Sequence, residues 1–186
     1  FIEGAIKNKI HKKQAVEIFE LLEKFAEYGF NKSHATAYAM ITFQTAWLKA
    51  YYPIEFLTAN ISSDINDTDR IVKLILECRR MKIEVKKPDI NLSNSDFQII
   101  NNNTIQYGLS AIKNIGGKAA EGIIQYRQKK GSFKSIFDLA KAAPLINKKV
   151  LESLILVGAC DSLEEHRSEM YESLELILNF IAKYHK

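Results

Sequence analysis

The chain has 186 residues, of which 47% are hydrophobic and 26% charged, and its formal net charge at neutral pH is +4. These values predict a globular protein with a packed core, folded as one ordinary domain or two small ones. No apolar run approaches the roughly 18–20 residues that span a bilayer, and the first residues do not resemble a signal peptide, so no membrane segment is predicted.

The number and spacing of the cysteines and histidines exclude simple metal-binding and redox motifs. The two cysteines, Cys78 and Cys160, form no CxxC pair, and each lies in an apolar helical context. We expect both to be buried free thiols in a reducing cytoplasm. The four histidines are too scattered to predict a metal site. Because the first residue is Phe1 and not Met, we expect the chain to be part of a longer protein.

The charge is unevenly distributed along the chain. Residues 1–117 carry 15 Lys and Arg against 13 Asp and Glu. Residues 118–149 carry 8 basic and 2 acidic residues, whereas residues 150–186 carry 3 basic and 7 acidic residues. The central block, with a net charge of +6, is typical of a phosphate-binding surface, although a solvated helix face gives the same pattern.

Helices dominate the first 81 residues. Apolar residues at helical spacing predict one helix that Gly29 ends. Ser33 is a suitable N-cap for the next helix, and Pro53 is suited to the first turn of a third. Asp67 and Asp69 open a fourth. The expected helices cover residues 13–28, residues 33–50, a segment from Pro53, and residues 67–81.

The pattern changes after residue 81. Residues 83–85 are predicted to form a short strand, and residues 97–100 and 104–107 to form a hairpin. Helical character returns at Gly108 and continues to the end of the chain. The predicted fold class is therefore mostly α, with a small β insertion.

Residues 108–124 contain glycines between two helical segments. The first short helix is expected to end at Asn114, residues 115–117 to form a tight turn, and a second helix to begin near Lys118. This pattern resembles the helix-hairpin-helix family of DNA-binding modules, although Gly117 stands where an aliphatic residue is usual. The sequence does not match a nucleotide-binding phosphate loop, because the earlier Gly and the following Ser or Thr are missing.

The resemblance implies a grip on the DNA backbone. Glycines let the main chain approach a phosphate closely, and the amides at a helix N-terminus point toward the anion. Such contacts read no bases and are sensitive to salt. The alternative is a helical turn whose glycines only permit packing. The residues predicted to bind DNA are Ile115, Gly116, Gly117 and Lys118.

A second, degenerate copy of the motif is predicted downstream. Residues 137–140 are expected to be helical, residues 144–147 to form a turn with Asn147 in place of the hairpin glycine, and Lys148 and Lys149 to begin the next helix. Both lysines are predicted to contact DNA, unless this copy mainly buttresses the first. Tandem copies of this family pair into a four-helix unit. The expected domains are a helical fingers subdomain at 1–82, a β connector at 83–107, a tandem helix-hairpin-helix module at 108–163, and a C-terminal amphipathic helix at 164–186.

Residues 28–53 carry the most specific pattern. They contain Gly-Phe-Asn-Lys-Ser-His at 29–34, Phe-Gln-Thr at 43–45, Trp-Leu-Lys at 47–49 and Tyr-Pro at 52–53. With these motifs the chain resembles the fingers domain of the C family of bacterial replicative DNA polymerases. The resemblance continues upstream and downstream in matching order and covers nearly the whole chain.

This second resemblance implies contacts with an incoming nucleotide from Lys32, Ser33, His34 and Tyr38. Cations and hydrogen-bond donors at a loop-to-helix junction can orient a triphosphate, and an aromatic ring one turn further can stack on a base pair. The alternatives are that Ser33 is only an N-cap, that His34 only begins a helix, and that Tyr38 is a core aromatic.

The catalytic centre of the resembled enzymes is expected outside this chain. Two-metal chemistry requires paired carboxylates, and the family's catalytic aspartates and the Mg²⁺ they hold lie upstream of these motifs. Asp67 and Asp69 have Asp-x-Asp spacing, but acidic residues at a helix start serve as caps. We expect no catalytic residue and no bound metal or cofactor in this chain, and no polymerase activity from it alone.

The resemblance also implies partners and a location. The expected partners are primer-template duplex DNA, an incoming dNTP and, through a longer protein, the sliding clamp and other replisome subunits, all in the cytoplasm and without a membrane. Two other functions stay open, a stand-alone helix-hairpin-helix DNA-binding adaptor without polymerase activity and a helical protein-interaction domain. The Lys-Ser-His element favours a polymerase over an adaptor. The glycine hairpin and the basic block favour either of these DNA-binding functions over a protein-interaction domain.

Overall fold

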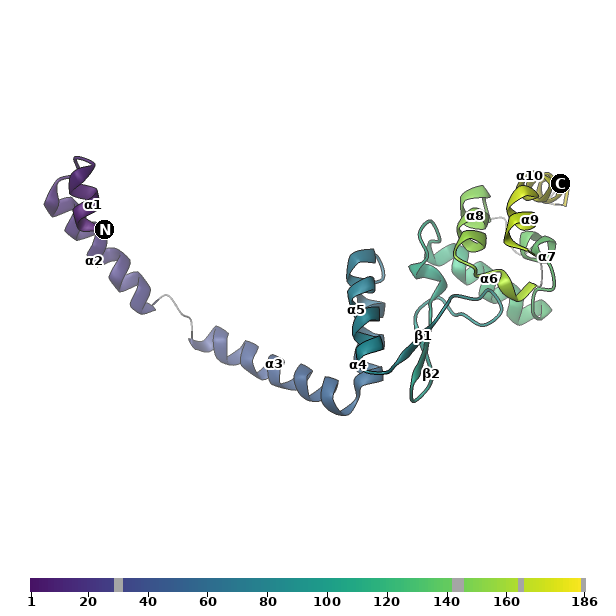
Figure 1. Cartoon of the computed structure of the whole chain (residues 1–186), viewed down its shortest axis with the longest axis horizontal. Helices are drawn as coiled ribbons and strands as arrows, with labels where there is room; N and C mark the ends of the chain where they lie inside the picture. Colours follow the sequence, from purple (N-terminus) through teal and green to yellow (C-terminus); the bar gives the residue numbers. More distant parts are fainter. Residues whose placement is uncertain (29–31, 142–145, 164–165, 185–186) are drawn as a thin grey trace. The chain divides into compact units, whose positions relative to one another are not determined.

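The structure is a computed structural model that describes residues 1–28, 32–141, 146–163 and 166–184 (Figure 1). Most of these residues are helical, and three short strands form one small sheet. This confirms the predicted fold class. The chain divides into two compact units, Phe1–Trp47 and Leu48–Lys186. None of the helices in the described ranges is long and apolar enough to cross a bilayer.

The first unit contains α1 (Ile2–Lys7), α2 (Lys12–Tyr28) and most of α3 (Lys32–Tyr51). The amide of Ile10 donates to the Ala5 carbonyl at 3.0 Å, and the ring of Phe1 stacks on Phe19 with their centroids 6.0 Å apart. The first contact closes the loop after α1, and the second packs the start of α1 against α2. Many apolar side chains in this unit nevertheless remain exposed, including Phe25 at 76%.

Helix α2 confirms the predicted helix over 13–28, with one further residue at its start. The predicted role of Ser33 as an N-cap is wrong, because α3 already begins at Lys32 and Ser33 therefore lies in its first turn. The stop predicted at Gly29 lies outside the described residues.

After the last residues of α3, the second unit contains α4 (Pro53–Ser63) and α5 (Thr68–Arg80). Pro53 occupies the first turn of α4, where its missing amide costs nothing. The Asp67 side chain accepts a hydrogen bond from the Arg70 amide at 3.0 Å and caps α5, as the sequence predicts. One core of the unit draws on both helices and on the strands that follow. Its buried residues include Leu57, Ile61, Ile71, Cys78, Phe97 and Ile105.

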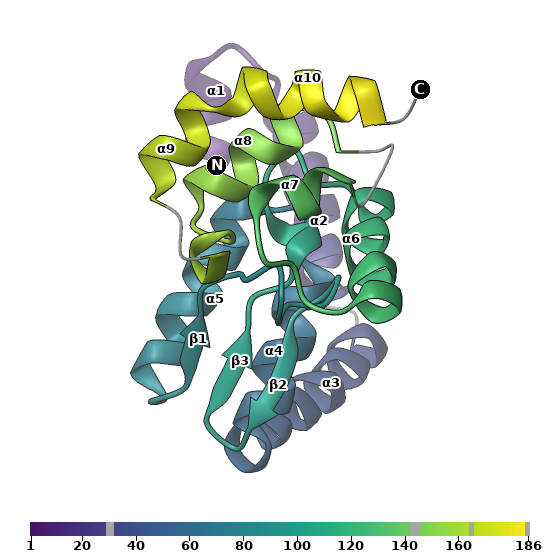
Figure 2. The ribbon, with the colours of Figure 1, turned by 90° about the vertical axis from the view of Figure 1, so that its right-hand side faces the viewer.

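The sheet consists of β1 (Glu84–Lys86), β2 (Gln98–Asn101) and β3 (Thr104–Gln106), in the order β1-β3-β2. Strands β2 and β3 form the predicted antiparallel hairpin, and β1 pairs with β3 in parallel. Figure 2 shows β3 between its two neighbours, and α4 packs against β2 and β3. The sheet thus joins the helical pair α4–α5 to the helices that follow.

The rest of the second unit is helical. Its elements are η1 (Leu109–Ala111), α6 (Gly117–Lys130), α7 (Ile136–Lys141), α8 (Lys148–Leu156), η2 (Asp161–Leu163), α9 (Arg167–Glu172) and α10 (Leu174–Tyr184). They enclose a second core, in which the fully buried residues include Leu109, Ile123, Leu139, Leu151, Leu154 and Ile177. Figure 2 shows α10 lying across the end of the helices that surround this core.

Two predicted helices differ in the structure. The helix expected to run up to Asn114 is reduced to the three-residue 3-10 helix η1, followed by Ile112 in an extended conformation. The single amphipathic helix expected at the C-terminus is divided into α9 and α10, with Ser173 as the C-cap of α9. Met170, Leu174 and Ile177 lie in the same core as α6 and α8.

Candidate nucleic-acid interface

The glycine hairpin lies between η1 and α6 and is anchored at one residue. The amide of Ile115 donates to the Ile112 carbonyl at 3.0 Å, and the Ile115 side chain is only 4% exposed. Asn114, directly before it, has a φ of 71°, in the left-handed region. The chain therefore turns sharply at Asn114 and buries one apolar side chain. The glycines that follow, Gly116 and Gly117, stay at the surface.

The start of α6 offers backbone donors to an external acceptor. Gly116 is its N-cap and has no side chain to satisfy the first amides. The amides of Ala119 and Ala120 donate to the Gly116 carbonyl at 3.0 and 3.1 Å. Among the described residues, no acceptor is found for the amides of Gly116, Gly117 or Lys118. Three amides at the positive end of a 14-residue helix form a favourable site for an anion.

The glycines of the hairpin are not required by the packing of the chain itself. A Cβ atom added at Gly116 or Gly117 would meet nothing within 4 Å, and neither residue has a positive φ. The fold would therefore accept alanine at both positions. What glycine provides here is open space above the backbone, through which a large anion can reach the amides.

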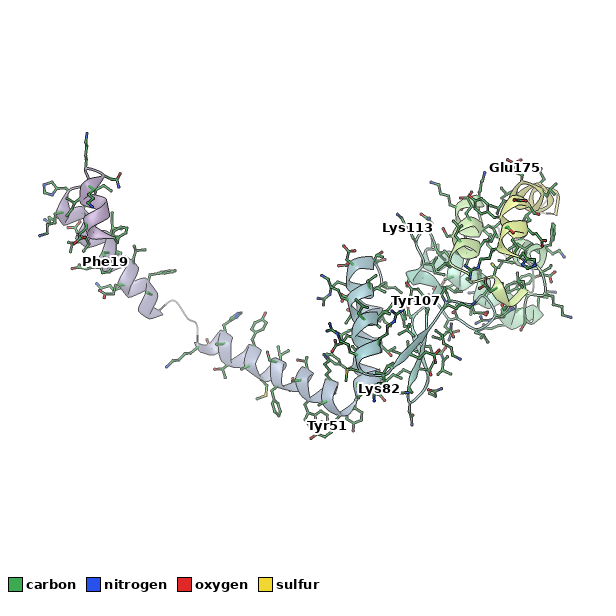
Figure 3. All side chains as sticks on the ribbon, in the orientation of Figure 1. Phe19, Tyr51, Lys82, Tyr107, Lys113 and Glu175 are labelled. Atoms are coloured by element: carbon green, nitrogen blue, oxygen red, sulfur yellow. The ribbon has the colours of Figure 1, made fainter. Side chains whose placement is uncertain are left out.

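The hairpin also borders a groove with a volume of about 730 Å³. The hairpin side is lined by residues from Ser110 to Gly116, and the opposite side by Ile65, Asn66 and Thr68 at the start of α5. Sequence reasoning missed the groove, because its two sides are more than forty residues apart along the chain. It also missed Lys113, an exposed cation in the lining that lies at the surface of the second unit (Figure 3).

The segment predicted to be a second copy of the motif has a different helix start. The Asn147 side chain is the N-cap of α8 and accepts a hydrogen bond from the Val150 amide at 3.0 Å. The Leu151 amide donates to the Asn147 carbonyl at 3.1 Å. Lys148 and Lys149 are exposed in the first turn of α8. Helix α8 is thus capped from within the chain, whereas α6 is not. The rest of the predicted turn, residues 144 and 145, lies outside the described residues.

The residues predicted to contact a nucleotide share the first two turns of α3. Lys32, Ser33 and His34 are exposed, and Tyr38 is 58% exposed. The rings of His34 and Tyr38 lie 4.4 Å apart, centroid to centroid, at an interplanar angle of 48°. The arrangement places a cation, a hydroxyl and two rings along one short stretch of helix.

No catalytic metal centre is evident in the described ranges. Within them, no group of three or more His, Cys, Asp or Glu side chains could hold a metal ion. Asp67, of the Asp-x-Asp pair, is used as a helix cap. Cys78 and Cys160 are buried and form no disulfide, which confirms the sequence prediction.

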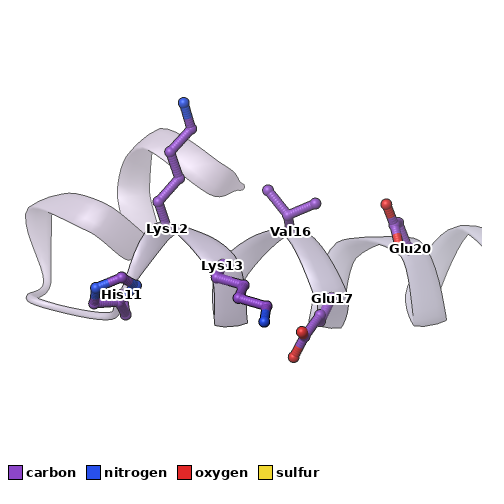
Figure 4. A pocket seen from close by; sticks show the side chains of 6 residues that line it. All are labelled: His11, Lys12, Lys13, Val16, Glu17 and Glu20. Atoms are coloured by element: carbon purple, nitrogen blue, oxygen red, sulfur yellow. The ribbon is translucent and has the colours of Figure 1, made fainter.

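A pocket of about 540 Å³ lies at the start of α2 in the first unit. Its side chains do not converge, because Lys12, Val16 and Glu20 point to one side of the helix and His11, Lys13 and Glu17 to the other (Figure 4). The two lysines lie at the start of the helix, and the two carboxylates follow further along it. This arrangement does not indicate a binding site for one class of ligand.

Comparisons with known proteins agree with this geometry. A protein-family model described as the helix-hairpin-helix motif matches residues 82–170. The chain is 47% identical over 177 residues to the DNA polymerase III subunit alpha of Buchnera aphidicola subsp. Schizaphis graminum, covering 94% of this chain and 15% of that protein. It is 46% identical over 176 residues to the protein of that name from Escherichia coli (strain K12), with the same coverage. The protein of that name from Vibrio cholerae is 43% identical over 188 residues, covering 100% of this chain and 16% of the relative.

The chain spans about one sixth of the length of these curated relatives. The matched segment includes both units of the structure, whereas the family model is confined to the second. The chain is therefore homologous, over nearly its full length, to a segment of the bacterial DNA polymerase III alpha subunits, and it carries a helix-hairpin-helix motif.

Proposed function

We propose that the chain is the segment of a bacterial replicative DNA polymerase that holds duplex DNA by its backbone and contributes contacts to the incoming nucleotide. The observation that carries this proposal is the hairpin at α6, with its open glycines and with amides that have no acceptor among the residues that the structure describes. The homology to DNA polymerase III alpha subunits supports DNA-templated nucleotidyl transfer in chromosome replication as the reaction of the whole protein.

On the DNA side, a phosphate group binds the amides of Gly116, Gly117 and Lys118, and the Lys118 ammonium adds a charge. Ile115 anchors the loop from inside. Lys148 and Lys149 contribute further positive charge at the start of α8, although Asn147 already occupies part of its amide donors. Because every contact is to the backbone, binding is independent of base sequence and weakens with salt.

On the nucleotide side, Lys32, Ser33 and His34 orient the triphosphate of an incoming dNTP, and Tyr38 stacks near the nascent base pair. Their exposure on the first turns of α3 and the contact between the His34 and Tyr38 rings support this role. A cation and hydroxyl at a helix start favour an anionic ligand. These residues belong to the fingers subdomain, proposed to extend over residues 1–82.

The remaining parts of the proposal concern the whole polymerase. Its Mg²⁺ ions supply the charge stabilisation of nucleotidyl transfer and are held by carboxylates outside this chain. The fragment alone is then inactive. The β connector at 83–107, the tandem module at 108–163 and the C-terminal helices at 164–186 form its DNA-holding part. The sliding clamp and other replisome subunits are partners of the longer protein, in the cytoplasm.

The DNA contact is tested by fluorescence anisotropy with labelled duplexes of two unrelated sequences. The unaltered chain is expected to bind both equally well. Gly116→Ala is expected to weaken binding about tenfold or more, because a methyl group holds the phosphate away from the amides, and a charged hydrogen bond contributes about 1.5–3 kcal/mol. Gly4→Ala is the matched control, because a Cβ there also meets nothing within 4 Å. Equal binding by the Gly116→Ala variant and the unaltered chain would contradict the proposal.

The stand-alone adaptor is the second candidate, because the family model matches residues 82–170 alone. Saturation-transfer NMR with dATP and Mg²⁺ distinguishes the polymerase segment from the adaptor. The method detects a ligand even when its dissociation constant is in the millimolar range. A polymerase segment is expected to give a signal that Lys32→Gln with His34→Ala abolishes and that Lys7→Gln in α1 leaves unchanged. Duplex binding without any dATP signal favours the adaptor.

A further inference from the structure

The groove beside the hairpin has two sides that come from different parts of the second unit. One side is the hairpin segment from Ser110 to Gly116, and the other consists of Ile65, Asn66 and Thr68 at the start of α5. These three residues lie outside the part of the chain that the helix-hairpin-helix family model matches. Any ligand role of this side is therefore additional to that motif.

The groove presents donors and one cation. The Asn66 carboxamide, the Thr68 hydroxyl and the Lys113 ammonium are exposed, and none of these side chains has a hydrogen-bond partner among the described residues. Gly116 is part of the same lining, and its amide has no acceptor in the described part of the chain. Donors and a cation from two sides are suited to a ligand that offers acceptors and negative charge.

Two of the three carboxylates near the groove, Asp64 and Asp67, have partners on α5, and the third, Asp69, is exposed in the first turn of α5. Asp64 forms an ion pair with the Arg70 guanidinium at 3.0 Å, and Asp67 accepts from the Arg70 amide. Neither carboxylate is part of the groove lining described above. Lys113 is the one charged residue that the described part of the chain contributes to the lining itself, and the carboxylates stand outside it on α5 and the loop before it.

We propose that the groove holds the sugar-phosphate backbone of one DNA strand where that strand continues from the hairpin. Asn66 and Thr68 donate to phosphodiester oxygens from the α5 side, and Lys113 pairs with the charge from the hairpin side. The inference rests on the proposed function, because Gly116 belongs both to the amide site and to the groove. It extends the DNA contact from the motif to the start of α5.

The test is an anisotropy titration of the full chain with labelled duplex DNA over a series of salt concentrations. The double variant Asn66→Ala/Thr68→Val is expected to bind DNA about tenfold more weakly, which corresponds to the loss of roughly one hydrogen bond to a charged group. Because both side chains are neutral, the slope of log K against log salt is expected to stay unchanged. Lys113→Gln is expected to reduce the slope of log K against log salt by about 0.9, the value for one phosphate. Lys73→Gln is the control, an exposed α5 lysine outside the groove lining.

The outcomes separate this inference from the function on which it rests. If the double variant binds as tightly as the unaltered chain, or if Lys113→Gln keeps the full slope, while Gly116→Ala still loses affinity, the groove inference is overturned and the hairpin contact stands. If the unaltered chain binds no duplex at low salt, both are overturned. All substituted positions are exposed, so the unfolding midpoints of the variants are expected to match that of the unaltered chain.

Discussion

Asn114 donates a hydrogen bond through Nδ2 to the Oγ atom of Ser153 at 3.0 Å, and this bond joins the glycine hairpin to α8. Asn114 has a φ of 71°, which Asn tolerates better than most residues. The next residue, Ile115, is buried in the core that also contains Leu151 and Leu154 of α8. Helix α8 therefore holds the glycine hairpin in place by one polar contact and by packing.

Two substitutions of Asn114 separate the contribution of its hydrogen bond to Ser153 from that of its left-handed backbone conformation. Asn114→Gly keeps the left-handed backbone accessible and loses the hydrogen bond, so it is expected to lower the free energy of unfolding by about 1 kcal/mol. Asn114→Ala also loses the hydrogen bond but, unlike Gly, keeps a Cβ in the left-handed region without the Asn carboxamide, so it is expected to cost about 1–2 kcal/mol more than the Gly variant. Urea denaturation measures both, with Ser153→Ala as the control that removes only the acceptor. Equal stability of the Gly and Ala variants would contradict this account.

Gly108 is the glycine that the fold itself requires. A Cβ there would lie 2.6 Å from the Asp96 carbonyl carbon and 2.6 Å from the Ser95 oxygen, both backbone atoms. Gly108→Ala is therefore expected to lower the free energy of unfolding by about 1–3 kcal/mol, as overpacking does. Gly117→Ala is the matched control, since its Cβ would meet nothing within 4 Å. If the denaturation midpoint falls equally for both variants, the backbone of Ser95 and Asp96 does not lie as close to Gly108 as described.

Asp161 joins η2 to α9 and to the segment after β1, and it makes stability depend on pH. Hydrogen bonds from Arg167, at 2.5 and 2.6 Å, and from Lys87 hold the pKa of the Asp161 carboxyl well below its usual range. Because the folded pKa is lowered, the contribution is present above the unfolded pKa of about 3.9 and is lost as the pH falls through the folded pKa.

We therefore expect Asp161→Asn to be less stable than the unaltered chain at pH 7, and the difference to shrink as the pH falls below about 4. Guanidinium unfolding between pH 7 and pH 3 measures it. A difference in the free energy of unfolding that stays constant over this range would mean that the carboxylate charge of Asp161 contributes nothing.

The Cys78 thiol is predicted to be inert in the folded chain. It is fully buried, and burial raises its pKa to about 11, so at pH 8 it is protonated. A thiol reagent added at pH 8 is expected to modify the folded chain slowly and to modify both cysteines rapidly in urea. Cys160→Ser isolates the signal of Cys78, and rapid labelling of that variant under native conditions would contradict its burial.

The sequence predicts those elements whose signals are local. Helix α2 follows from apolar residues at helical spacing, and the start of α5 follows from Asp67, which caps the helix through an amide three residues away. The hairpin of β2 and β3 is likewise a local structure. In each case the contacts that determine the structure lie within a few residues along the chain.

Long-range contacts explain what the sequence does not predict. The segment before the hairpin forms only a short 3-10 helix, because the amides of Leu109 and Ser110 donate to the carbonyls of Asn94 and Ser95. Strand β1 pairs in parallel with β3, which no local signal indicates. The groove places Thr68 opposite residues more than forty positions away. In the candidate site, therefore, the hairpin glycines could be predicted, but Asn66 and Thr68 could not.

The most direct test of the central claim is the salt dependence of duplex binding by the unaltered chain and by Gly116→Ala/Lys118→Ala. A backbone grip at the start of α6 predicts that log K falls linearly with log salt, that the double variant loses most of the affinity, and that its slope is smaller by about 0.9, the value for one phosphate. Binding that ignores salt, or a double variant that matches the unaltered chain, would contradict the claim that this hairpin holds DNA.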